Sequence, residues 1–130
     1  MSRYVYYEPN EKAHKRGNND CVIRAFTKAL NKPWLEVFDG LVAIARKKQY
    51  IINSKPVYVK YLKDNNFVRN SIPIQPGKSK PTVREFALEH LKGTYILSVS
   101  KHLVAVVDGY YYDRWNCGNR KVYCCYKKED

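Results

Sequence analysis

The stretch TYILSVSKHLVAVVDGYYYDRW, residues 94–115, decides the fold class of this 130-residue chain. It holds strand-forming residues on both sides of Asp108-Gly109, and an Asp-Gly pair in such a position is a strong signal for a two-residue hairpin turn. The strands that we predict are residues 95–100, 102–107, 110–115 and 120–126, with a further turn at 116–119. The C-terminal part of the chain therefore predicts an antiparallel sheet.

The residues before this stretch have the spacing of amphipathic helices. After Cys21, one helical face carries the apolar residues Val22, Ala25, Phe26, Ala29 and Leu30. The helices that we predict run from 21 to 30, from Pro33 to about Lys48, from Ser54 to the Asp64-Asn65-Asn66 stop, and from Thr82 to Gly93. Helices followed by strands indicate the α+β class.

Length and composition favour one folded domain over residues 1–130. The chain is 45% hydrophobic and 28% charged, which is typical of a globular protein. No stretch approaches the ~20 consecutive apolar residues that cross a bilayer, and the N-terminus has no apolar signal segment. We therefore expect a cytoplasmic protein with no membrane association.

The cysteines lie at positions 21, 117, 124 and 125. Cytosolic thiols stay reduced, and no pair has the C-x-x-C spacing of a structural zinc site. Adjacent residues in a strand point to opposite faces, which argues against a disulfide between Cys124 and Cys125 and against their binding one metal ion together. We predict no disulfide, no metal and no cofactor.

The net charge of +12 favours a negatively charged partner: nucleic acid, anionic lipid or an acidic protein. The excess is scattered, which is more typical of solubility than of a binding stripe. Two tight triplets, His14-Lys15-Arg16 and Arg46-Lys47-Lys48, leave nucleic-acid binding open, with Arg46, Lys47 and Lys48 as candidate phosphate contacts. The tyrosine run 110–112 is more typical of a half-buried strand than of a base-stacking platform. Trp115 is more typical of a core residue than of a wall of a substrate site.

The hairpin brings a histidine and an aspartate together. With a two-residue turn, Val107 opposes Tyr110, so His102 and Asp113 become diagonal neighbours on one face, roughly 7 Å apart between Cβ atoms. A three-residue turn would instead place Asn116 opposite His102. The Asp-Gly pair favours the first register, and with it Asp113 as the residue that orients His102.

Cys21 is the candidate nucleophile. In the first turn of a helix it feels the positive end of the helix dipole, which stabilises the thiolate. The Cys21 backbone N–H, with Asn18 or Asn19 as a second donor, would hold the oxyanion of a tetrahedral intermediate. Each of these residues alone has an ordinary structural explanation; their combination indicates catalysis.

These residues resemble those of papain-like cysteine peptidases. Residues 18–25, NNDCVIRA, are similar to the Asp-Gly-Asn-Cys-Leu-Phe-Arg-Ala box of ovarian-tumour-type deubiquitinases. Residues 102–107, followed by Asp108-Gly109 and Tyr112-Asp113, are similar to the histidine strand and later aspartate of bacteriocin-processing peptidases. The whole chain looks like small phage and prophage proteins.

The resemblance implies a papain-like fold, with N-terminal helices on a C-terminal antiparallel sheet, and acyl transfer through a thioester. Cys21 would attack an amide, His102 would relay the proton and Asp113 would orient His102. The chain differs from the family in having no Gln before Gln49 and in having Asn18 where the box has Asp, which leaves the second oxyanion donor open.

The leading hypothesis is a thiol peptidase or isopeptidase acting on a protein or peptide substrate with an acidic surface, in the cytoplasm of the host cell if the chain is phage-encoded. One alternative is a basic module that binds nucleic acid. Another is a catalytically degenerate peptidase fold that binds a host factor.

Overall fold

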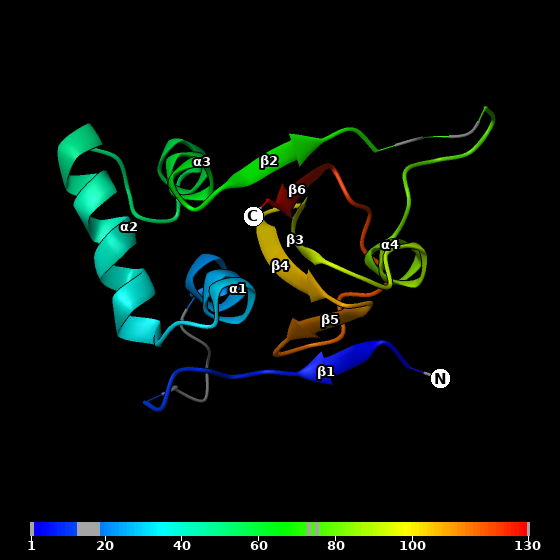
Figure 1. Cartoon of the computed structure of the whole chain (residues 1–130), viewed down its shortest axis with the longest axis horizontal. Coiled ribbons are helices and arrows are strands. Elements are labelled where there is room, and N and C mark those ends of the chain that lie inside the picture. Colours follow the sequence, from blue (N-terminus) through cyan, green and yellow to red (C-terminus); the bar gives the residue numbers. More distant parts are fainter. Residues whose placement is uncertain (1, 13–18, 73, 75, 130) are drawn as a thin grey trace.

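The computed structural model describes residues 2–12, 19–72, 74 and 76–129, and within these it contains four helices and a six-stranded mixed sheet (Figure 1). The predicted α+β class is confirmed. The helices are α1 (Cys21–Leu30), α2 (Trp34–Lys48), α3 (Lys55–Asp64) and α4 (Val83–Glu89). The strands are β1 (Tyr4–Tyr6), β2 (Phe67–Asn70), β3 (Thr94–Val99), β4 (His102–Val107), β5 (Tyr110–Asp113) and β6 (Cys124–Lys128). None of the described helices is long and apolar enough to cross a membrane.

The sheet has the strand order β1-β5-β4-β3-β6-β2. Strands β3, β4 and β5 form an antiparallel meander, and β6 is antiparallel to β3. Strand β1 pairs in parallel with β5, and β2 pairs with β6. The prediction of a purely C-terminal, antiparallel sheet was therefore wrong at both edges. The two edge strands have three and four residues, which is too short for an alternating pattern to stand out in the sequence.

The β4–β5 hairpin has the register that the Asp-Gly turn predicts. Val107 pairs with Tyr110, and both turn residues have positive φ, 49° at Asp108 and 85° at Gly109. Positive φ at both central positions is the conformation of a type I′ turn, which Asp-Gly adopts readily. The register brings the start of β4 beside the end of β5.

Some predicted boundaries were wrong by two residues or more. The last strand begins at Cys124 rather than at residue 120, because Val122 N donates to Pro81 O instead of to a neighbouring strand. Helix α4 and strand β5 end at Glu89 and Asp113, short of the predicted residues 93 and 115. The segment after β5 is thus a loop, which leaves its side chains free to line a cleft.

Helices α1, α2 and α3 cover one face of the sheet and α4 covers the other (Figure 1). The core on the first face contains Phe26, Leu41 and Leu103, and the core on the second contains Phe86 and Tyr111. Neighbouring residues of one strand contribute to different cores, as the two-residue period of a strand requires. This packing fixes α1 against β4 and sets the position of the side chains at the start of the helix.

Candidate active site

Helix α1 places Cys21 in its first turn. Before it, Asn19 has a left-handed backbone with φ 50°, and Asp20 occupies the N-cap position, within the predicted residues. The first bond of the helix runs from Arg24 N to Asp20 O, 2.8 Å. The Asp20 carboxylate makes no capping hydrogen bond. It therefore leaves the partial positive charge of the first-turn N–H groups available to Cys21.

His102 begins β4 and Asp113 ends β5, and their side chains are hydrogen-bonded. The distance from His102 Nε2 to Asp113 Oδ2 is 2.5 Å. The Asp113 side chain is 1% exposed and that of His102 is 10% exposed. Because Nε2 is bonded to Asp113, Nδ1 is the ring nitrogen that remains available to bond the Cys21 thiol.

Asn116, the alternative orienting residue, does not have this role in the structure. Its Oδ1 accepts hydrogen bonds from Tyr111 OH at 2.7 Å and from Gly118 N at 3.0 Å. The two-residue turn is the physical reason, since it gives the place beside His102 to Asp113.

The environment of Cys21 favours its thiolate. Burial by itself raises the pKa of the thiol, but hydrogen bonding to the His102 side chain and to the Leu103 backbone lowers it. The positive charges of His102 and Arg24 act in the same direction, and the net result is a lowered pKa. The thiolate is the nucleophilic form of cysteine, so this thiol is more reactive than an ordinary one.

The pKa of His102 is shifted in the opposite direction. Burial lowers it, whereas hydrogen bonds of the ring, first of all to Asp113, raise it to about 11. Burial raises the pKa of Asp113, but its hydrogen bond to His102 and the nearby positive charges outweigh this effect and leave it lowered. The arrangement therefore stabilises an imidazolium between two anions, the Cys21 thiolate and the Asp113 carboxylate.

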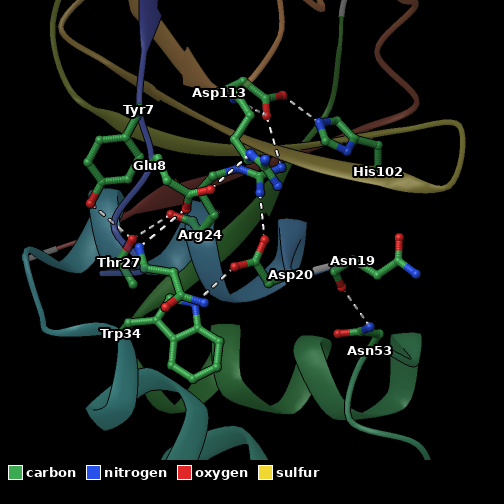
Figure 2. A network of polar contacts seen from close by, with 12 residues as sticks. Tyr7, Glu8, Asn19, Asp20, Arg24, Thr27, Trp34, Asn53, His102 and Asp113 are labelled. Atoms are coloured by element: carbon green, nitrogen blue, oxygen red, sulfur yellow. Dashed lines mark hydrogen bonds and ion pairs between the residues drawn. The ribbon is translucent and has the colours of Figure 1, made fainter. Parts of the chain in front are cut away.

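A buried arginine extends this arrangement (Figure 2). Arg24 donates from Nη1 to Asp20 Oδ1 at 2.7 Å and from Nη2 to Asp113 Oδ1 at 3.0 Å. Trp34 Nε1 donates to the other Asp20 oxygen at 3.0 Å. The contacts of Asp20, Arg24 and Trp34 were not predicted. The signal for Arg24 was a charged residue inside an otherwise apolar stretch of helix, four positions after an aspartate.

Cys21 and His102 line a cleft of about 940 Å³. Its other lining residues include Lys55, Lys101 and Trp115, all of them exposed. Trp115 is 41% exposed and its ring centroid lies 5.1 Å from that of His102. The interpretation of Trp115 as a core residue was therefore wrong; it forms a wall of the cleft beside the histidine.

The expected oxyanion donors are described only in part. Asn18 lies outside the described residues. Asn19 lines the cleft, and its backbone oxygen accepts a hydrogen bond from Asn53 Nδ2 at 3.1 Å. Asn53 lines the cleft as well, so it holds the loop that precedes Cys21. The sequence gave no signal for this contact, which joins positions 34 residues apart.

Cys117 lies beside the histidine–aspartate pair. One ligand-type atom from each of His102, Asp113 and Cys117 lies within 4.8 Å of the others. Nitrogen, oxygen and sulfur donors are a set that zinc accepts. A metal ion here would have to displace the hydrogen bond between His102 and Asp113. Burial raises the pKa of the Cys117 thiol, which keeps it protonated.

The basic cluster proposed for nucleic acid lies elsewhere. Arg46, Lys47 and Lys48 are exposed in the last turn of α2, where positive side chains also stabilise the negative end of the helix dipole. Tyr111 is fully buried and Tyr110 and Tyr112 are half-buried, which confirms the tyrosine run as a sheet strand.

Comparisons with protein-family models, with curated proteins and with solved structures find no match for this chain. The structure defines an α+β protein in which a cysteine and a histidine line one cleft and the histidine is bonded to a buried aspartate.

Proposed function

We propose that this protein is a cysteine hydrolase with a papain-like fold, most closely a thiol peptidase or isopeptidase. Cys21 is the nucleophile, His102 the proton carrier and Asp113 the orienting group. The observation that carries the proposal is the geometry: a cysteine in the first turn of a helix and a histidine bonded to an aspartate line one cleft. The lowered pKa of the Cys21 thiol, to which His102 contributes, supports it.

The proposed reaction begins from the thiolate–imidazolium pair. The Cys21 thiolate attacks the carbonyl carbon of an amide, a C–S bond forms and the carbonyl π electrons move to oxygen. The Cys21 N–H and an Asn19 donor stabilise this oxyanion. The oxyanion re-forms its double bond, the C–N bond breaks, and His102 gives its proton to the leaving nitrogen. A thioester and a free amine result.

Hydrolysis of the thioester completes the cycle. His102, now neutral, takes a proton from water, and the hydroxide equivalent attacks the thioester carbon. The C–S bond breaks and the electron pair returns to sulfur, which restores the Cys21 thiolate and releases a carboxylic acid. Asp113 keeps the ring in the orientation that both proton transfers need.

The substrate class that we propose is an acidic peptide segment. Lys55 and Lys101 line the cleft, whereas Arg114, which lines it too, is ion-paired with Glu8 at 2.9 Å. Among the described lining residues the only carboxylate is Asp20, which is buried and bonded to Arg24. The charge facing a substrate is therefore positive, and it favours aspartate or glutamate near the bond that is cleaved.

The test is selective alkylation. We expect dilute iodoacetamide at neutral pH to modify Cys21 far faster than Cys117, Cys124 or Cys125, as mapped by peptide mass spectrometry. Cys124 is the internal control, because it is half-exposed like Cys21 but lies in a strand. Equal rates at Cys21 and Cys124 would remove the basis of the proposal.

The exposed basic cluster at the end of α2 supports nucleic-acid binding as a second candidate. In that case a gel shift at low salt would retard single- or double-stranded nucleic acid, and Arg46→Glu would weaken the shift. No retardation by the wild-type protein excludes this candidate. A degenerate peptidase that only binds a host factor would keep its biological effect in Cys21→Ala, whereas the hydrolase would lose it.

A further inference from the structure

The ionisable groups of the site form a chain in which the charges alternate. It runs from the Asp20 carboxylate to the Arg24 guanidinium, then to Asp113, His102 and Cys21. Arg24 joins the two carboxylates, since it is bonded to both of them. Without Arg24, the His102 imidazolium would be the only positively charged group in this series to balance two buried carboxylates.

We propose that Arg24 is a positioning residue of this site, which holds Asp113, and through it His102, in line with Cys21. The proposal rests on the hydrolase function proposed above. Arg24 lies on the same helix as Cys21, three positions on, and binds a carboxylate at the end of β5. One side chain thus couples the element that carries the nucleophile to the element that orients the base.

The shape of the guanidinium suits this coupling. Two of its nitrogens donate in different directions, Nη1 to Asp20 at 2.7 Å and Nη2 to Asp113 at 3.0 Å. A lysine ammonium is a single point on a flexible stem and cannot reproduce a planar fork. The Asp20 end is itself fixed by Trp34 Nε1, at the start of α2. Arg24 therefore cannot move toward or away from Asp113 without breaking other contacts.

Stability alone is a weak explanation for these charges. The side chains of Arg24, Asp20 and Asp113 are 6%, 3% and 1% exposed, so all three have lost their hydration. Replacing a buried ion pair by apolar residues is often neutral or stabilising. An apolar residue at position 24 would also suit a helix whose neighbouring residues are buried. Orientation of Asp113 gives the arginine a role that an apolar residue cannot take.

The charge of Arg24 also acts on the thiol. It contributes to the lowered pKa values of both Cys21 and Asp113. His102 from β4 and Tyr58 from α3 also face the thiol, and the charged residues Asp20, Lys55 and Lys101 line the same cleft. Burial raises the pKa of Tyr58, so that its hydroxyl stays neutral where Cys21 titrates. A change in the Cys21 titration after mutation of Arg24 is therefore not due to Tyr58.

The experiment measures the rate of Cys21 alkylation by iodoacetamide as a function of pH. We expect Arg24→Gln to move the acid limb of the profile to higher pH and to slow the reaction about tenfold on that limb, because less of the thiol is ionised. Arg24→Lys keeps the positive charge but loses the planar fork of donors. Its alkylation profile should lie between those of Arg24→Gln and wild type. In an Asp113→Asn background, Arg24→Gln should shift the profile less than it does in the wild-type background, because only the direct effect of the Arg24 charge on the thiol remains.

Lys28→Gln is the matched control. Lys28 is half-buried on the same helix, one turn further on, and its Nζ lies over the Tyr112 ring at 4.1 Å. Its substitution removes the same charge and should leave the profile unchanged.

Folded Arg24→Lys and Arg24→Gln variants with the wild-type profile would overturn the positioning role, as would failure of both variants to fold. If wild-type Cys21 itself reacts like an ordinary thiol, the hydrolase proposal fails instead, so the two failures are distinguishable.

Discussion

Two thiols of this protein, those of half-exposed Cys21 and of buried Cys125, have opposite electrostatic environments. At the start of α1, His102 and Arg24 outweigh the effect of burial and lower the pKa of Cys21. In β6, Cys125 lies in the apolar core beneath α4, where burial and the neighbouring Cys124 raise the thiol pKa to about 12. Burial alone therefore gives an inert thiol. A reactive one requires cations that the fold places beside it.

Of the three histidines in the sequence, the two in the described residues, His102 and His90, differ in the same way. His102 is bonded to a buried carboxylate and lines the cleft. His90 stacks on Phe86 with ring centroids 3.7 Å apart, and its Nδ1 is bonded to the Phe86 backbone oxygen. The first is part of a chain of charges, and the second completes the packing of α4. Substitution of each histidine in turn therefore tests which of them affects the reactivity of Cys21.

The largest effect is expected from His102→Gln. Without the imidazolium the Cys21 thiolate loses its main stabilising partner, so iodoacetamide labelling of Cys21 near neutral pH should slow by about a hundredfold. His90→Gln removes a histidine outside the cleft and should leave the labelling rate unchanged. Equal effects of the two substitutions would show that the chosen histidine is not the partner of the thiol.

A large loss of stability is expected from Asp113→Asn. The substitution leaves the Arg24 guanidinium buried with one carboxylate instead of two, and removing one partner of a buried ion pair costs about 3 kcal/mol. Asn116→Ala is the control, because it removes only neutral hydrogen bonds and should cost about 1 kcal/mol. Urea unfolding gives both values. A loss at Asp113 no larger than that at Asn116 would contradict the ion-pair network.

The pH dependence of stability provides a further test. The pKa of His102 is raised from 6.5 to about 11. A raised pKa stabilises the folded protein fully below the unfolded value, and this contribution is lost as the pH rises from about 6.5 to about 11. The free energy of unfolding should therefore fall over this range by more in wild type than in His102→Gln. Parallel curves for the two proteins would mean that His102 is not held as an imidazolium.

The smallest effect concerns the charge of the cleft. Lys55 lines the cleft at the first position of α3, where a glutamate is compatible with the helix dipole. Lys55→Glu should lower the ratio of iodoacetate to iodoacetamide labelling rates at Cys21 by about threefold, because iodoacetate is anionic. Lys92→Glu makes the same change in net charge at an exposed site outside the cleft and should leave the ratio near that of wild type. The same fall in both variants would argue against an acidic substrate.

Much of this architecture could be predicted from local sequence patterns. Helix starts at 21, 34 and 55 follow from apolar spacing and from breakers, and the hairpin register follows from Asp108-Gly109. That register is what brings His102 and Asp113 together. The edge strands β1 and β2 were not predictable, because their pairing depends on the sheet beside them rather than on their own residues.

The contacts of Arg24 were beyond sequence reasoning for a related reason. Its bond to Asp113 joins positions 89 residues apart, and it depends on how α1 packs against the sheet. The prediction that Trp115 lies in the core was wrong. A large apolar side chain is typical of a core, but the loop after β5 places this one at the cleft. Local patterns thus locate the reactive groups, and tertiary packing determines what surrounds them.

The proposed site depends on Cys21 being a thiolate paired with His102 at neutral pH. The most direct measurement is the ultraviolet absorbance of the thiolate, recorded as a pH titration of wild type minus Cys21→Ser. We predict a thiolate signal that is already present at neutral pH and disappears only on acidification. A signal that appears only near the ordinary cysteine pKa of about 8.5 would contradict the account.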